Sequence, residues 1–128
     1  HAIQGGFFPQ LSAPQQWYLQ AALDEERHHL GFLLDQGAAP PPTTFFFPAD
    51  VFEDRVQFLA LLATLENAFI SAYLAAIPRL HALGEPLLAE IAGQILGVEA
   101  EHRVLGRVLQ GEKLPHNRCL AVVYHRQR

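Results

Sequence analysis

The sequence predicts an all-α protein with three long helices in a single domain, residues 1–128. Apolar residues recur at helical spacing through residues 13–36, 50–77 and 86–110. Proline and glycine separate these segments and mark their ends. A chain of 128 residues can bury a substantial core, and its 50% hydrophobic and 17% charged residues are typical of a folded domain.

The charge and hydropathy patterns disfavour two classes of partner. The formal net charge is −4 and lysine and arginine form no cluster, so we expect no nucleic-acid partner. No apolar run approaches the roughly 20 residues that cross a bilayer, so we expect no transmembrane segment. The single cysteine, Cys119, excludes an internal disulfide.

The first helix is expected to follow Ser12, an N-cap that Gln15 completes as a capping box. Gly37 suits the position after its last turn. The connection that follows, AAPPPTTFFFP at residues 38–48, contains three consecutive prolines that exclude a helix. The phenylalanines at 45–47 are too apolar for a free linker, so we expect the connection to pack along the helices.

The second helix is expected to begin at Asp50, with Glu53 completing a capping box, and to end before Pro78. It is apolar almost all round, as in a helix with neighbours on several sides. The third helix is expected over residues 86–110, followed by a tail at residues 111–128.

The polar block of the first helix separates by helical phase, since successive residues are turned by about 100°. Glu26 falls near the centre of the apolar stripe and His29 lies well inside it. Glu25 lies at its edge and His28 beyond it. The spacing therefore favours Glu26-x-x-His29 as the inward-facing pair.

The same test applied to the other helices finds a second pair and a lone acid. Glu66 interrupts an otherwise apolar row of the second helix. Glu99 and His102 lie three residues apart on the apolar side of the third helix, and Glu101 points away from it.

Three carboxylates on apolar stripes require an explanation, because each ionised carboxylate costs several kcal/mol to bury without a partner. Two divalent cations would neutralise these charges, and each neutral imidazole would supply a nitrogen ligand. The i, i+3 spacing places Glu and His close enough to bind one metal. The candidate metal ligands are Glu26, His29, Glu66, Glu99 and His102.

The remaining polar residues have simpler interpretations. Tyr73 is expected to be a core tyrosine with a satisfied hydroxyl. No catalytic residue is assigned. A solvated face, or support for the ligands, is expected of Glu25, Arg27, His28, Glu101 and Arg103.

Three segments carry a resemblance to a known family: EERHHLGFL at 25–33, FLALLATLENAFISAYLAA at 58–76 and LLAEIAGQILGVEAEHRVL at 87–105. Their order resembles the ferritin-like domain family that includes plant desiccation-related proteins and many bacterial stress-associated proteins. The resemblance implies a ferritin-like four-helix bundle with a long crossover. The three helices would be the second, third and fourth, so the domain is expected to be N-terminally incomplete, with its first helix and one glutamate ligand upstream of His1.

The resemblance also implies a function, a dimetal carboxylate protein with two divalent ions, iron or manganese. It would act in oxidative or desiccation stress through metal oxidation or through O2 and peroxide chemistry, as a di-iron or di-manganese oxidoreductase. The alternative is a non-catalytic protective bundle with a degenerate or absent metal site. A zinc-dependent hydrolase is a third, weaker interpretation. Homo-oligomerisation and the compartment, cytoplasmic or exported, stay open.

Overall fold

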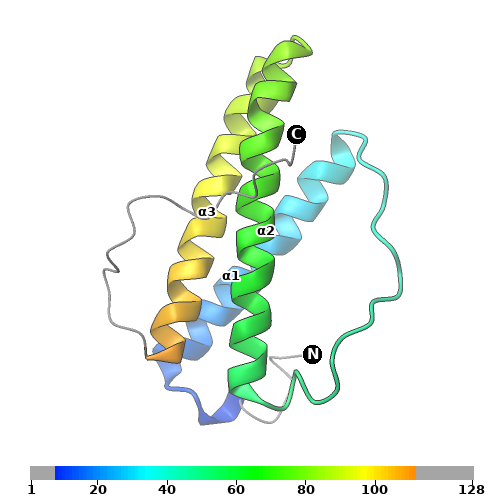
Figure 1. Cartoon of the computed structure of the whole chain (residues 1–128). Helices are drawn as coiled ribbons and strands as arrows, with labels where there is room; N and C mark the ends of the chain where they lie inside the picture. Colours follow the sequence, from blue (N-terminus) through cyan, green and yellow to red (C-terminus); the bar gives the residue numbers. More distant parts are fainter. Residues whose placement is uncertain (1–7, 112–128) are drawn as a thin grey trace, which may run out of the picture. The chain divides into compact units, whose positions relative to one another are not determined.

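The computed structural model describes residues 8–111, and all regular structure in that range is helical (Figure 1). A short 3-10 turn precedes three α-helices. The all-α prediction is therefore confirmed for the described part of the chain, while the predicted tail at 112–128, with Cys119, lies outside it. The elements are η2 (Phe8–Gln10), α1 (Ala13–Asp35), α2 (Arg55–Ala82) and α3 (Pro86–Gln110).

The chain divides into two compact units, residues 1–58 and residues 59–128. In the first unit, α1 begins where the sequence predicts. The backbone N–H of Ser12 donates to the side-chain oxygen of Gln15 at 2.9 Å, as in a capping box. The helix ends at Asp35, one residue earlier than expected, and Gly37 follows with a positive φ of 88°. Glycine adopts that conformation without steric cost.

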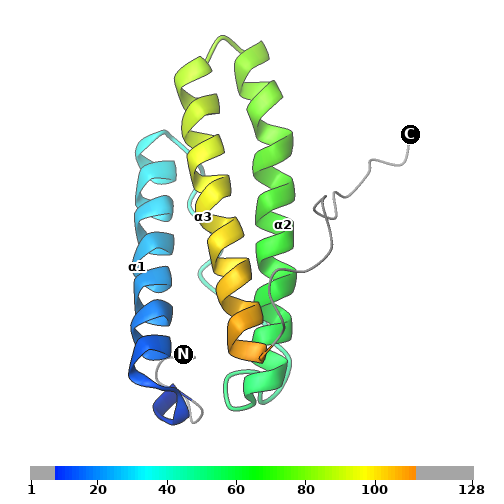
Figure 2. The ribbon, with the colours of Figure 1, turned by 90° about the vertical axis from the view of Figure 1, so that its left-hand side faces the viewer.

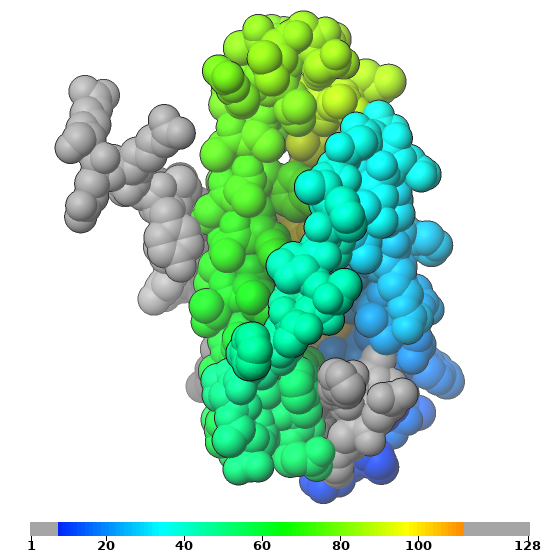
Figure 3. Space-filling model, turned by 90° about the vertical axis from the view of Figure 1, so that its right-hand side faces the viewer, coloured from blue at the N-terminus to red at the C-terminus, as the bar shows by residue number. Residues whose placement is uncertain are grey.

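The connection between α1 and α2 is more exposed than the sequence suggested (Figure 3). Phe45, Phe46 and Phe47 are 61%, 94% and 45% exposed, so the expectation that the connection packs along the helices is wrong. Successive residues of an extended segment point to opposite sides. Phe45 and Phe47 accordingly share a side, with ring centroids 6.4 Å apart, and Phe47 meets Phe52 edge-on at 5.1 Å. Phe46 stands between them in the sequence and is the most exposed of the three.

The predicted start of α2 at Asp50 is wrong, because the helix begins more than one turn later. The helix begins at Arg55, because Asp50 lies in a turn with φ of 61°, outside helical geometry. The cap is Asp54, whose Oδ1 accepts the backbone N–H groups of Val56 at 2.8 Å and Gln57 at 3.1 Å. These bonds, Gln57 first, lower the pKa of Asp54. Two aspartates four residues apart both resemble caps, and only the fold distinguishes them.

The predicted end of α2 at Pro78 is also wrong, since the helix continues to Ala82. A proline inside a helix removes one backbone hydrogen bond but leaves the following ones available. Packing against α3 continues at this level, where Ile77 Cδ1 would lie 3.9 Å from a Cβ added to Gly93. The helix ends at Ala82, two residues before Gly84, which has a φ of 82°, and the N–H of Glu85 donates to the carbonyl of Leu80.

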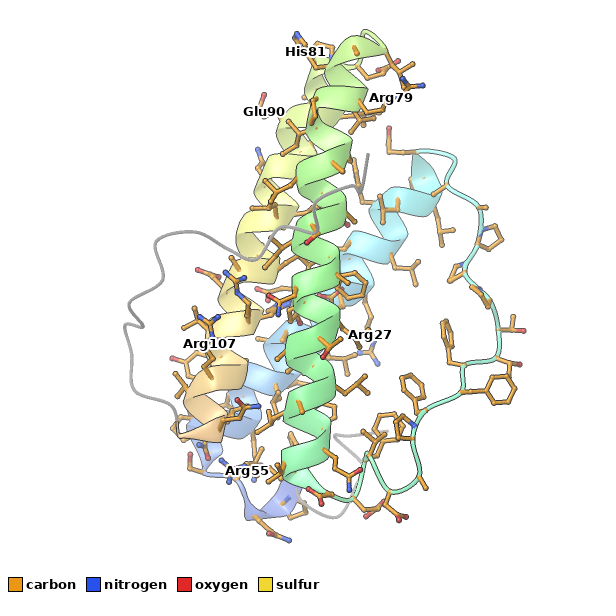
Figure 4. The ribbon with its side chains drawn as sticks, viewed as in Figure 1. Arg27, Arg55, Arg79, His81, Glu90 and Arg107 are labelled. Atoms are coloured by element: carbon orange, nitrogen blue, oxygen red, sulfur yellow. The ribbon has the colours of Figure 1, made fainter. Side chains whose placement is uncertain are left out.

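In the second unit, α2 and α3 lie side by side and antiparallel, as an αα-hairpin (Figures 1 and 2). Arg79 and His81 lie on the last turn of α2, where cations interact favourably with the helix dipole, and Glu90 lies near the start of α3 (Figure 4). The predicted bounds of α3 are confirmed. Its close contact with α2 is at Gly106, where an added Cβ would lie 3.7 Å from Leu62 Cδ2.

By length and apolar composition, α2 could cross a membrane. Among the helices of residues 8–111 no other meets these two criteria. The core helix of a bundle meets the same two criteria. Glu66 lies near its middle and is buried against α3, which favours a bundle helix. No clear transmembrane segment is therefore found among the described residues.

Candidate metal centre

The second unit places three acidic and imidazole side chains inside the hairpin. Glu66 of α2 is 3% exposed, and Glu99 and His102 of α3 are 2% and 4% exposed. On α3 the two ligand candidates continue the row of small and apolar buried residues that includes Ile95 and Gly106. The helical phase that buries this row therefore also buries Glu99 and His102.

The three side chains converge on one point. His102 Nδ1 lies 3.8 Å from Glu66 Oε1 and 3.8 Å from Glu99 Oε2. Each residue offers a ligand atom within 4.8 Å of the other two. These separations exceed those of short hydrogen bonds, and they resemble the roughly 3–4 Å between donor atoms that share a metal at about 2.1 Å. Two carboxylates and an imidazole form a donor set that fits a divalent cation.

The charge of this group supports the same interpretation. Two carboxylates share the site with one imidazole, so the group carries excess negative charge whenever both acids are ionised. Burial of such charge costs several kcal/mol unless a cation compensates it. A divalent ion would supply the compensation within reach of all three side chains.

One compensating cation, Arg103, lies beside the group, and the sequence left open whether it belongs to a solvated face or supports the ligands. Arg103 is half-buried, and its Nη1 donates to Asn67 Oδ1 across the hairpin at 3.0 Å. Burial lowers the pKa of Arg103, repulsion by Arg107 lowers it further, and attraction to Glu66 offsets part of the change. The sequence signal was positional, because Asn67 and Arg103 directly follow Glu66 and His102.

The first unit contains the other Glu-x-x-His pair, on α1. His29 Nδ1 lies 3.9 Å from Glu26 Oε2, and their side chains are 14% and 39% exposed. The neighbouring Glu25 and His28 are exposed, in agreement with the helical phase that favoured Glu26 and His29. Arg27 points to solvent and pairs with Asp24 at 3.0 Å, as expected for the outer face.

The two Glu-x-x-His pairs have nearly the same internal geometry, with Nδ1–Oε2 distances of 3.9 Å on α1 and 3.8 Å on α3. The i, i+3 spacing produces this similarity, since it places both side chains over the same turn. Each pair can therefore present a carboxylate oxygen and an imidazole nitrogen together.

Long helices with buried carboxylate and imidazole groups define a class of α-helical proteins that can hold metals inside a bundle. A comparison with family models is consistent with that class. The model of the ferritin-like domain matches residues 8–112, and the chain therefore belongs to the ferritin-like domain family. No curated protein and no solved structure matches the chain. The resemblance drawn from the sequence is thus confirmed at the level of the family.

Proposed function

We propose that this chain is a dimetal carboxylate protein of ferritin-like type, with two divalent iron or manganese ions. The observation that carries the proposal is the buried group of Glu66, Glu99 and His102, whose ligand atoms converge within the hairpin. Oxygen and nitrogen donors without a thiolate suit iron and manganese. Membership of the ferritin-like domain family supports the same choice.

The full ligand set proposed here adds the α1 pair to that group. In ferritin-like carboxylate proteins, two helices contribute a Glu-x-x-His each and two contribute a single Glu. Glu26 with His29, and Glu99 with His102, correspond to the two pairs, and Glu66 corresponds to a single glutamate. In the same scheme α1, α2 and α3 are the second, third and fourth helices of a four-helix bundle, and residues 38–49 supply its long crossover.

Bound iron or manganese would supply redox chemistry toward O2 or peroxide, in oxidative or desiccation stress. The chain's own residues define the conditions for it. The carboxylates of Glu66 and Glu99 neutralise positive charge, and the imidazole of His102 presents a nitrogen from the same turn of α3. Burial of all three excludes bulk water, which strengthens every electrostatic interaction at the site.

The test is metal content and its dependence on single residues. The purified chain is stripped with chelator, reloaded anaerobically with Fe2+ or aerobically with Mn2+, and analysed by plasma mass spectrometry after gel filtration. We expect about two equivalents per complete four-helix domain. The variants Glu26→Ala, Glu66→Ala and His102→Ala should lose metal, whereas Glu25→Ala and His28→Ala, one residue from the α1 ligands, should retain it.

A folded chain that takes up neither metal would overturn the proposal. That outcome would support the non-catalytic protective bundle, in which the buried acids serve no ligand. Zinc uptake with iron and manganese excluded would instead indicate a zinc site, which needs three protein ligands and an open position.

A further inference from the structure

A side-chain hydrogen bond crosses the hairpin at the level of the candidate ligands. Arg103 Nη1 donates to Asn67 Oδ1 at 3.0 Å, between residues 36 apart in sequence. Asn67 directly follows Glu66 on α2, and Arg103 directly follows His102 on α3. The bond therefore joins the two helices beside the pair of side chains that must meet across them.

Because of its position, this bond affects the distance between the side chains of Glu66 and His102. Glu66 and His102 come from different helices, so their 3.8 Å separation depends on the register and rotation of α2 against α3. Backbones of adjacent residues in a helix move together. A bond from Asn67 to Arg103 therefore restrains the sliding and rotation that would separate Glu66 from His102.

The chemistry of the two side chains suits such a restraint. A hydrogen bond from a charged donor is shorter and stronger than a neutral one, and the planar guanidinium loses less freedom on bonding than a lysine does. The bond is partly buried, so water competes for it less than at the surface.

We propose that Arg103 and Asn67 are positioning residues, whose hydrogen bond holds Glu66 and His102 in the separation that metal binding requires. The proposal rests on the proposed metal-binding function. Of the two roles that the sequence leaves open for Arg103, a solvated face or support for the ligands, it specifies the second. Arg107, one turn later on α3, is the matched cation (Figure 4).

The test is a double-mutant cycle on metal affinity. Arg103→Met and Asn67→Leu each remove one side of the bond, and Arg107→Met removes the neighbouring cation on α3. Dissociation constants for Mn2+ and Co2+ are measured by titration on the stripped chain, together with the Co2+ absorption spectrum and the melting temperature without metal. Loss of a residue that orients ligands weakens metal binding by about 10-fold to 100-fold.

We expect Arg103→Met and Asn67→Leu to weaken binding by about tenfold each and to alter the Co2+ spectrum. The double variant should bind about as well as either single one, because the same bond is lost in all three. Arg103→Lys should restore part of the affinity, and Arg107→Met should bind as the wild type does.

Wild-type affinity and spectrum in Arg103→Met would overturn the positioning role while leaving the metal site intact. Additive losses in the double variant would overturn it as well, since the two residues would then act separately. A wild-type chain that binds no metal overturns the proposed function, and this inference with it. If Arg103→Met does not fold, Asn67→Leu and Arg103→Lys decide the question by the same measurements.

Discussion

Replacing Glu99 by leucine should raise the free energy of unfolding of the metal-free protein and lower it, relative to the wild type, when metal is bound. Glu99 is 2% exposed, and its carboxylate shares the interior of the hairpin with Glu66 and a single imidazole. A leucine of similar volume removes one negative charge and leaves Glu66 opposite His102 at 3.8 Å. The variant therefore leaves one carboxylate for one imidazole.

The magnitude follows from the distances. Ligand atoms of Glu66 and Glu99 lie within 4.8 Å of each other, and two like charges at that separation repel by about 3.5 kcal/mol at an effective dielectric of 20. Loss of the attraction between Glu99 and a protonated His102 is of the same order. These two changes nearly cancel, so the burial of leucine in place of a carboxylate decides whether the variant is more or less stable. Replacing buried ionic groups by apolar ones typically stabilises a protein by about 1–4 kcal/mol. We expect a gain of about 1–2 kcal/mol without metal.

The assay is urea unfolding followed by far-UV circular dichroism, once in chelator and once in Mn2+. In chelator, Glu99→Leu should unfold at a higher urea concentration than the wild type. Its melting temperature should rise by about 4 °C for each kcal/mol of added stability. Free Mn2+ at a hundredfold excess over its dissociation constant should stabilise the wild type by about 2.7 kcal/mol and the variant not at all. The order of stability therefore reverses when metal is added.

Glu101→Gln is the control, because Glu101 lies two residues away on the exposed side of α3. Its unfolding should match the wild type in both solutions. The reasoning is refuted if Glu99→Leu loses more than about 1 kcal/mol in chelator, since single large losses are typical of a broken buried pair. It is also refuted if the variant keeps the full stabilisation by Mn2+.

Three further predictions concern the fold around the site. Gly106→Ala should stabilise the chain by about 0.5–1 kcal/mol in urea unfolding, because alanine favours helix and its Cβ would meet Leu62 at an ordinary contact distance of 3.7 Å. Gly84→Ala should destabilise it by about 1 kcal/mol, since the φ of 82° suits glycine alone; an unchanged urea midpoint would contradict this. The lowered pKa of Asp54 makes its contribution to stability fully present above the usual aspartate pKa and lost as the pH falls through its folded-state pKa. Asp54→Asn should therefore remove that part of the acid dependence measured by urea midpoints across the acid range, whereas an identical dependence would exclude the cap.

Helical periodicity predicted the three long helices and the inward-facing side of each. It did so because burial of an apolar stripe is a sum over many residues, and one misplaced residue does not change it. The same phase selected Glu26 and His29 over their exposed neighbours, and placed Glu66 on the buried face.

The two ends of α2 could not be predicted from the sequence, because they depend on few residues. Capping depends on one or two side chains, and Asp50 and Asp54 carry the same chemistry one turn apart. Only the turn at residues 49–53, with Asp50 at a φ of 61°, leaves Asp54 free to accept the first N–H groups of the helix. Pro78 presents the same difficulty, because its local cost is opposed by packing against α3 that no local pattern contains.

Arg103 shows why the surroundings of a site are harder to predict than its ligands. The distance between Glu99 and His102 is fixed within one helix by the i, i+3 spacing, and α1 reproduces it with Glu26 and His29. The distance between Glu66 and His102 depends on how two helices pack, and periodicity carries no information on register between them. Register comes from specific contacts such as the close approach at Gly106 and the Arg103–Asn67 bond. The spacing within a helix therefore places a glutamate and a histidine together, whereas the contacts between α2 and α3 determine whether Glu66 reaches the pair of Glu99 and His102.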